Sequence, residues 1–253
     1  MIVDPDFRGH HIAEEMAKVR IDIAKQLNLV GFWTDCVTNH PYSQDEMIAF
    51  GAQETGVLLG ASPSREMAGL QNFTDTRMSF LSCYLSLKEN INTIYLPQNH
   101  IDFVNDLTQK VDIKRRIKTS KGLGSGESIY SVKVNPATQM ANFKVQHIGE
   151  DFSAAISAEL TKLESQNLAF TMLNLPISQE AAASAFSQLE DMGFFWGAWL
   201  PNYSAQGDVI RLQKLHESIN VNEIICARAQ GEEIKKYVIS EWNRVSPKNE
   251  NGA

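Results

Sequence analysis

The chain has 253 residues but only three cysteines, Cys36, Cys83 and Cys226, and they lie far apart. No two of them have zinc-finger spacing, and an odd number does not form a closed disulfide framework. This scarcity excludes the small disulfide-stabilised and zinc-finger classes. It favours a reducing compartment, and we expect a cytoplasmic protein.

Long hydrophobic runs are also absent. No apolar stretch approaches the roughly 18 residues that a membrane-spanning helix needs, and Asp4 and Asp6 interrupt the start of the chain, where a secretory leader would be apolar. Positive charge is scarce, because the formal net charge is −7. An acidic chain is not suited to coating nucleic acid. We therefore expect no membrane partner and no nucleic-acid partner.

One basic cluster, residues 114–118, precedes a stretch rich in glycine and serine. A P-loop would need Gly-Lys-Ser/Thr after its glycines, and this stretch has none. No aromatic residues alternate with the basic ones, as single-stranded nucleic-acid sites require. We interpret residues 114–128 as a solvated linker, with phosphate or RNA binding as the alternative.

The remaining sequence has the composition of a soluble globular protein. Hydrophobic periodicity predicts an alternation of helices and strands, hence an α/β fold. We expect the strand at 29–37 to be parallel, Ser178 to cap a helix, and Asp208 and Arg211 to form a surface or interdomain pair. The predicted helices cover 9–27, 43–53, 99–109, 151–165, 178–191 and 232–245; the predicted strands cover 29–37, 57–59, 77–87, 92–97, 128–134, 140–148, 168–175, 194–200, 209–215 and 224–229.

The most informative segment is the turn that leads through Arg8 into the first helix. A helix N-terminus offers free N–H groups and the positive end of a dipole, which bind phosphate. Arg8, Ile12 and Ala13 fit the pattern Arg/Gln-x-x-Gly-x-Gly/Ala, so that the segment resembles the coenzyme-A loop of the GNAT N-acetyltransferase family. The resemblance implies acetyl-CoA as co-substrate, contacted by Val3, Arg8, Gly9, His10, His11, Ile12 and Ala13.

The segment departs from the family pattern in several ways. His11 stands at the middle glycine, and the strands that precede this loop in the family are missing, so we expect an N-terminally incomplete first unit. The position of the tyrosine that acts as general acid in the family is occupied here by Met47, which cannot donate a proton. His40, which we also expect to contact the cofactor, and Tyr42 are the candidate catalytic substitutes; the alternative for His40 is a histidine in an ordinary turn.

The adjacent histidines His10 and His11 suggest a metal site at first sight. Neighbouring residues on a helix point about 100° apart, so they rarely chelate one ion. No cluster of cysteine or carboxylate residues at ligand spacing supports them. We expect no metal.

The second part of the chain repeats the order of the first. A strand that ends at Pro176 precedes a helix, as the start of the chain precedes the helix from Gly9, and Gly193–Trp196 corresponds to Gly31–Trp33. We therefore expect two tandem GNAT-like units with mixed sheets flanked by helices. Their predicted bounds are 1–88 for the partial unit, 89–245 for the second, degenerate unit and 246–253 for a disordered tail.

Two functions follow from the resemblance. The first is acyl-CoA-dependent transfer of an acetyl group to an unknown amine, with Asp4 or Asp35 as candidate bases. The second is a non-catalytic GNAT-like module for ligand or protein binding. The second unit, a second copy of the chain or another partner chain is the candidate to take the place of the missing strands.

Overall fold

The computed structural model describes residues 3–64 and 76–246. The first half of the chain forms two helices and three strands of the main sheet, and a short strand follows them. Its elements are η1 (Pro5–Phe7), α1 (Ile12–Gln26), β1 (Gly31–Val37), α2 (Tyr42–Ala49), β2 (Gln53–Ser62), β3 (Met78–Ser86) and β4 (Asn92–Tyr95).

The second half contributes four further helices and the other strands. Its elements are α3 (Gln98–Val111), β5 (Arg115–Lys118), β6 (Ile129–Asn135), β7 (Met140–His147), α4 (Phe152–Leu163), η2 (Glu164–Gln166), β8 (Phe170–Pro176), α5 (Ala182–Asp191), β9 (Phe195–Ser204), β10 (Gly207–Leu215), η3 (Val221–Glu223) and α6 (Ala229–Val245).

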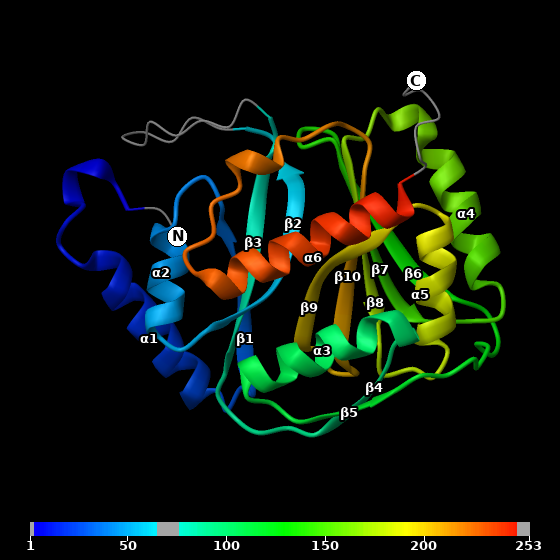
Figure 1. Cartoon of the computed structure of the whole chain (residues 1–253), viewed down its shortest axis with the longest axis horizontal. Coiled ribbons are helices and arrows are strands. Elements are labelled where there is room, and N and C mark those ends of the chain that lie inside the picture. Colours follow the sequence, from blue (N-terminus) through cyan, green and yellow to red (C-terminus); the bar gives the residue numbers. More distant parts are fainter. Residues whose placement is uncertain (1–2, 65–75, 247–253) are drawn as a thin grey trace.

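Eight strands form one mixed sheet in the order β1-β3-β2-β9-β10-β8-β7-β6, and β4 pairs with β5 beside it. The helices α3 and α6 cross in front of the middle of the sheet, α1 and α2 lie at one end, and α4 and α5 lie at the other (Figure 1). The predicted fold class, α/β with a large mixed sheet and flanking helices, is confirmed. No helix in the described part of the chain is long and apolar enough to cross a membrane.

The sheet has a mirrored strand order about its centre. The order β1-β3-β2 on one side corresponds to β8-β10-β9 on the other, and the two halves meet where β2 runs antiparallel to β9. At this junction Gly56 lies opposite Ala198, and a Cβ on Gly56 would stand 2.2 Å from the Cα of Ala198. Glycine is therefore required for the two halves to approach each other.

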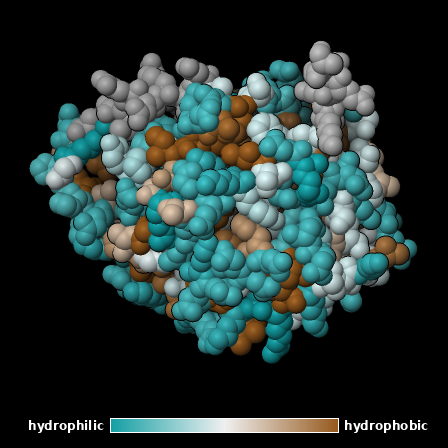
Figure 2. Space-filling view, in the orientation of Figure 1, coloured by the Kyte–Doolittle hydropathy of each residue, from teal (hydrophilic) through white to brown (hydrophobic). Residues whose placement is uncertain are grey.

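The core lies between the sheet and α3, α5 and α6. Trp196 and Trp199 of β9 are completely buried, and Phe103 packs edge-on against Trp196 with ring centroids 5.4 Å apart. Burying large aromatic rings of this kind contributes about 1.5–3 kcal/mol each. The face shown in Figure 2 is accordingly mostly hydrophilic, with hydrophobic residues in small groups.

Several predictions about single elements are wrong. The strand β1 is not parallel, because all its pairs with β3 are antiparallel. The helix α5 begins at Ala182 rather than at Ser178, and its N-cap, Ala181, has no side-chain hydrogen bond. Residues 224–229 form no strand, since this segment runs from η3 directly into α6.

The basic segment is not a solvated linker throughout. Residues 115–118 form β5, which pairs parallel with β4. The side chain of Arg115 is fully buried in an ion pair with Asp208, whereas Lys114 is exposed. The expected pair of Asp208 and Arg211 is also wrong, because both side chains are buried and Arg211 bonds to Asp35 at 3.2 Å. Of the predicted tail, residues 247–253 lie outside the described part of the chain.

Candidate functional site

The loop from Arg8 to Ala13 joins η1 to α1 on the surface. The backbone adopts the left-handed region at Gly9 (φ 82°) and His11 (φ 56°), and the helix starts at the next residue, Ile12. Arg8 Nε donates to the carbonyl oxygen of Val3 at 3.2 Å. Within residues 3–11 the element before the helix is the short η1, not a strand.

The two adjacent histidines of this loop are both exposed. His11 Nδ1 lies 3.2 Å from Glu14 Oε2 in the same helical turn, and Lys18 holds Glu14 at 2.8 Å. Glu14 and Glu15 place negative charge at the first turn of α1. That negative charge interacts favourably with the helix dipole but repels an anionic ligand.

The candidate catalytic residues His40 and Tyr42 lie together after β1. Their rings stack with centroids 5.0 Å apart, with His40 buried and Tyr42 exposed. Burial lowers the pKa of His40 below its ordinary value, and its Nδ1 has no hydrogen-bond partner. A neutral imidazole of this kind can accept a proton. Met47, at the position of the family's tyrosine, is buried in the core.

A second candidate site lies where the parallel strands β7 and β8 separate. Their pairing runs from Met140–Phe170 to Lys144–Asn174 and ends there, although β7 continues to His147 and β8 to Pro176. An open hollow of about 630 Å³ lies next to the end of β7. It is lined by Gln146 and His147 of β7, by the segment 178–181 that follows β8, and by residues 123–125. Ligands of open α/β sheets bind in such crevices outside the carboxyl ends of the strands.

The side chain of Gln179 bridges this opening. Its Oε1 accepts from the backbone N–H of Ile148 at 2.9 Å, and its Nε2 donates to the carbonyl oxygen of Gln146 at 2.8 Å. One amide group thus satisfies a donor and an acceptor at the end of β7. The titratable side chains that line the hollow are His147 and Glu180.

Sequence reasoning missed this site, although a signal was present. Gln146 and Gly149 fit the first and fourth positions of the coenzyme-A loop pattern, which begins in the last residues of β7 and ends before the helix α4. Asp151 stands at its last small position. The acidic residues Glu150 and Asp151 made this occurrence inconspicuous.

The loop between β7 and α4 is held by the glycine- and serine-rich segment before β6. Gly149 N–H donates to Ser128 Oγ at 3.0 Å, and Glu150 N–H donates to the carbonyl oxygen of Gly126 at 2.9 Å. A Cβ on Gly124 would stand 2.2 Å from the carbonyl oxygen of Ile148. Two N–H groups that a diphosphate would need are therefore already bonded within the chain.

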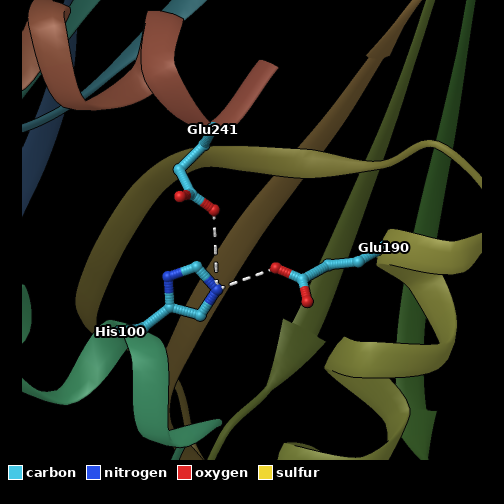
Figure 3. Close-up of side chains that lie close together, drawn as sticks. All are labelled: His100, Glu190 and Glu241. Atoms are coloured by element: carbon cyan, nitrogen blue, oxygen red, sulfur yellow. Dashed lines mark hydrogen bonds and ion pairs between the residues drawn. The ribbon is translucent and has the colours of Figure 1, made fainter. Parts of the chain in front are cut away.

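A third polar cluster joins α3, α5 and α6 (Figure 3). His100 is fully buried; its Nε2 lies 2.9 Å from Glu190 Oε1 and 3.8 Å from Glu241 Oε2. Its Nδ1 lies 2.5 Å from the Tyr237 hydroxyl. Ligand atoms of His100, Glu190 and Glu241 fall within 4.8 Å of one another, close enough to hold an ion.

Arg244 gives this cluster a simpler explanation. Its guanidinium bonds to both Glu190 and Glu241, so a protein cation already stands between the carboxylates. Burial favours a raised pKa for Glu190, but the hydrogen bond and charge of His100, with the charge of Arg244, outweigh it and hold the pKa below its ordinary value. We read the cluster as an ion-pair network that fastens three helices.

The comparisons with known proteins give little. No family model matches the chain, and no curated protein matches it. Among solved structures, a chain of the crystal structure of the NatC complex bound to Gag peptide and CoA is similar at 12% identity and a TM-score of 0.29. The similarity covers 36% of this chain and 60% of that chain, and an agreement of this extent carries no argument about function.

Proposed function

We propose that the chain binds an acyl-CoA at the opening between β7 and β8 and transfers the acyl group to an amine. The observation that carries this proposal is the separation of two parallel strands beyond Lys144 and Asn174, with an open hollow of about 630 Å³ between the end of β7 and the segment 178–181 that follows β8. The GNAT resemblance of the sequence, with its acetyl-CoA co-substrate, agrees with a ligand at such an opening.

The donor and acceptor bridged by Gln179 fit one part of acyl-CoA. The N–H of Ile148 and the carbonyl of Gln146, both bonded to Gln179, present the hydrogen-bonding pattern of a strand edge. An extended amide chain such as the pantetheine arm can join this edge when it replaces the Gln179 amide. A backbone N–H at this strand end can also polarise a thioester carbonyl. His147 and Glu180 are the candidate acceptors for the proton of the attacking amine.

The diphosphate of CoA has a poorer fit. Gly149 and Glu150 donate their N–H groups to Ser128 and Gly126, and two carboxylates, Glu150 and Asp151, lie at this turn. These contacts favour a second candidate function, a non-catalytic module with the acyltransferase architecture. In that case Gln179 and residues 124–128 close the opening permanently.

We also propose that the mirrored strand order reflects two related units, with the division at residues 88 and 89 predicted from the sequence. The succession α1-β1-α2-β2-β3 corresponds to α4-β8-α5-β9-β10, which supports this proposal. In the second unit β4, α3, β5, β6 and β7 precede α4, the counterpart of α1. Within the described residues, the strand pair at the opening therefore belongs to the second unit.

Isothermal titration calorimetry with acetyl-CoA tests the leading function. Ala154→Glu places a carboxylate in the first turn of α4, beside the loop after β7, and is expected to lower the affinity at least tenfold. Ala158→Glu, the same change one turn later on an exposed position, is the matched control and should bind normally.

Each other outcome also decides between the functions. If Arg8→Glu abolishes binding and Ala154→Glu does not, the site is the first loop. If no heat is measured at millimolar acetyl-CoA, the acyltransferase proposal is wrong and the non-catalytic module stands. Release of free CoA thiol in the presence of a panel of amines then separates transfer from binding alone.

A further inference from the structure

The helix α1 carries a hydrophobic stripe that faces solvent. Met16, Val19, Ile23 and Leu27 are 46%, 56%, 49% and 67% exposed. They follow one another at spacings of three and four residues, so their side chains form one continuous row on the helix. The helix packs on its own domain through another face, because Ala17, Ile21 and Ala24 are its buried residues.

The corresponding helix in the second half of the chain is covered. In α4, Phe152, Ile156 and Leu163 have similar spacing and are almost completely buried. The stripe of α1 has the composition of a packed helix face, yet nothing within the described residues covers it. A helix face of this kind favours a partner.

The exposed apolar surface around α1 matches in size the largest patch on a typical monomer, which is often functional. Phe7 and Leu29 are 59% and 43% exposed and lie at the two ends of the stripe in the sequence, so residues 7–29 hold six of the twelve exposed large hydrophobic side chains in the described chain. Together they present on the order of 500 Å² of surface. Covering it from both sides would remove about 1,000 Å², the lower bound for a specific interface.

The stripe follows a heptad pattern with charged flanks. Met16, Val19 and Ile23 of the stripe, with the half-buried Ile12 one turn before them, are separated by four, three and four residues, as the a and d positions of a coiled coil are. Leu27, the last residue of the stripe, falls at an e position. Glu15 then occupies a g position and Arg20 the following e position. The side chains of Glu15 and Arg20 are 66% and 46% exposed. Glu15 contacts Lys18 at 2.8 Å, and Arg20 lies 3.9 Å from Glu46.

These charges select one partner and one orientation. When two copies of α1 pair in parallel, Glu15 of each copy lies beside Arg20 of the other. An antiparallel pair that stacks the same four layers would instead bring Glu15 beside the acidic Asp22 and Arg20 beside the uncharged Ala13, so neither residue would form an ion pair. The charges on the two flanks of the stripe are therefore complementary to a parallel second copy.

We propose that the α1 stripe is the interface of a homodimer, in which two copies of this chain pack their α1 helices in parallel about a two-fold axis along the helices. Four hydrophobic layers, from Ile12 to Ile23, form the seam. Two Glu15–Arg20 ion pairs flank it. The interface uses no residue of the opening between β7 and β8. A test of the dimer is therefore independent of a test of the proposed function.

Sedimentation equilibrium of the full chain in the micromolar range tests the proposal. The wild-type chain is expected to be a dimer, and Ile23→Glu, which places a charge in the seam, to be a monomer. Ile91→Glu is the matched control, because Ile91 is also 49% exposed but lies away from α1 in the sequence, and it should remain dimeric. A monomeric wild-type chain, or a dimer that Ile23→Glu leaves intact, would overturn the proposal.

A charge exchange tests the orientation. Glu15→Arg and Arg20→Glu, each alone, create like-charged neighbours across a parallel seam and are expected to weaken dimerisation on the order of tenfold. The double variant restores the two pairs and should regain the wild-type affinity. Failure of the double variant to recover would contradict the parallel arrangement. Circular dichroism of each variant confirms that the fold is retained.

Discussion

Arg115 and Asp208 form a fully buried ion pair, although 93 residues separate them in the sequence. Arg115 Nε lies 2.7 Å from Asp208 Oδ2, and Nη2 lies 3.1 Å from Oδ1, so the contact is bidentate. The indole N–H of Trp199 donates to the same carboxylate at 2.9 Å. The pair joins β5 to β10 and fixes the small β4-β5 sheet against the main sheet.

Removal of this carboxylate should destabilise the fold strongly. Asp208→Ala leaves the Arg115 guanidinium buried without a counter-charge, which costs about 3–5 kcal/mol. The control is Glu89→Ala, which breaks the exposed Lys114–Glu89 pair and should cost less than about 1 kcal/mol. Urea unfolding at neutral pH measures both. Equal small losses would show that the buried pair contributes little.

The position of Arg115 also shows what sequence reasoning could not reach. From residue 114 to residue 118 exposure alternates, with Arg115 and Ile117 inward and the lysines and Arg116 outward. That alternation predicts a strand. A charged arginine, however, is expected to face solvent unless a buried partner for it is known, so the sequence does not indicate that Arg115 faces inward. The partner, Asp208, was visible in the sequence only as a charge on another strand.

The elements themselves were largely predictable because their periodicity is local. The hairpin of β6 and β7 and the helices α1, α3, α4 and α6 lie close to where apolar spacing placed them. The direction of β1 was not predictable from local periodicity. An apolar run of this kind is typical of parallel strands, whereas β1 pairs antiparallel with β3. The opening at β7 and β8 depends on strand neighbours, which no local pattern specifies.

The His100 network should contribute to stability in the same way as the buried ion pair. His100→Ala removes the partner of the Tyr237 hydroxyl and of Glu190, and we expect a loss of about 2–4 kcal/mol. His10→Ala, on an exposed loop, should have no measurable effect. Because Arg244 supplies the cation, treatment with a chelator should leave the unfolding midpoint unchanged; a fall in the midpoint would instead identify a bound metal.

The burial of His40 makes stability depend on pH. Burial lowers the pKa of His40 below 6.5 in the folded chain, so below that pH the unfolded chain binds more protons than the folded one. The contribution of a neutral His40 is present above pH 6.5 and is lost as the pH falls through the folded-state pKa. His40→Gln should therefore lose less stability than the wild type between about pH 7.5 and about pH 5.5.

The control for this effect is His10→Gln, which replaces an exposed histidine. Its loss of stability over the same pH interval should match that of the wild type. Urea midpoints measured at each pH provide the comparison. An unchanged pH dependence in His40→Gln would mean that folding does not lower the pKa of His40.

The Gln179 bridge should compete with any ligand of the β7–β8 opening. A ligand that takes the N–H of Ile148 and the carbonyl of Gln146 must first displace the Gln179 amide. Gln179→Ala removes the competitor and should raise the affinity for acetyl-CoA about tenfold, while two lost hydrogen bonds lower stability by about 1–2 kcal/mol. Calorimetry and urea unfolding measure the two effects on the same variant. A variant that is less stable and still does not bind acetyl-CoA would indicate that Gln179 has a structural role, holding the segment after β8 against the end of β7, in agreement with the non-catalytic function.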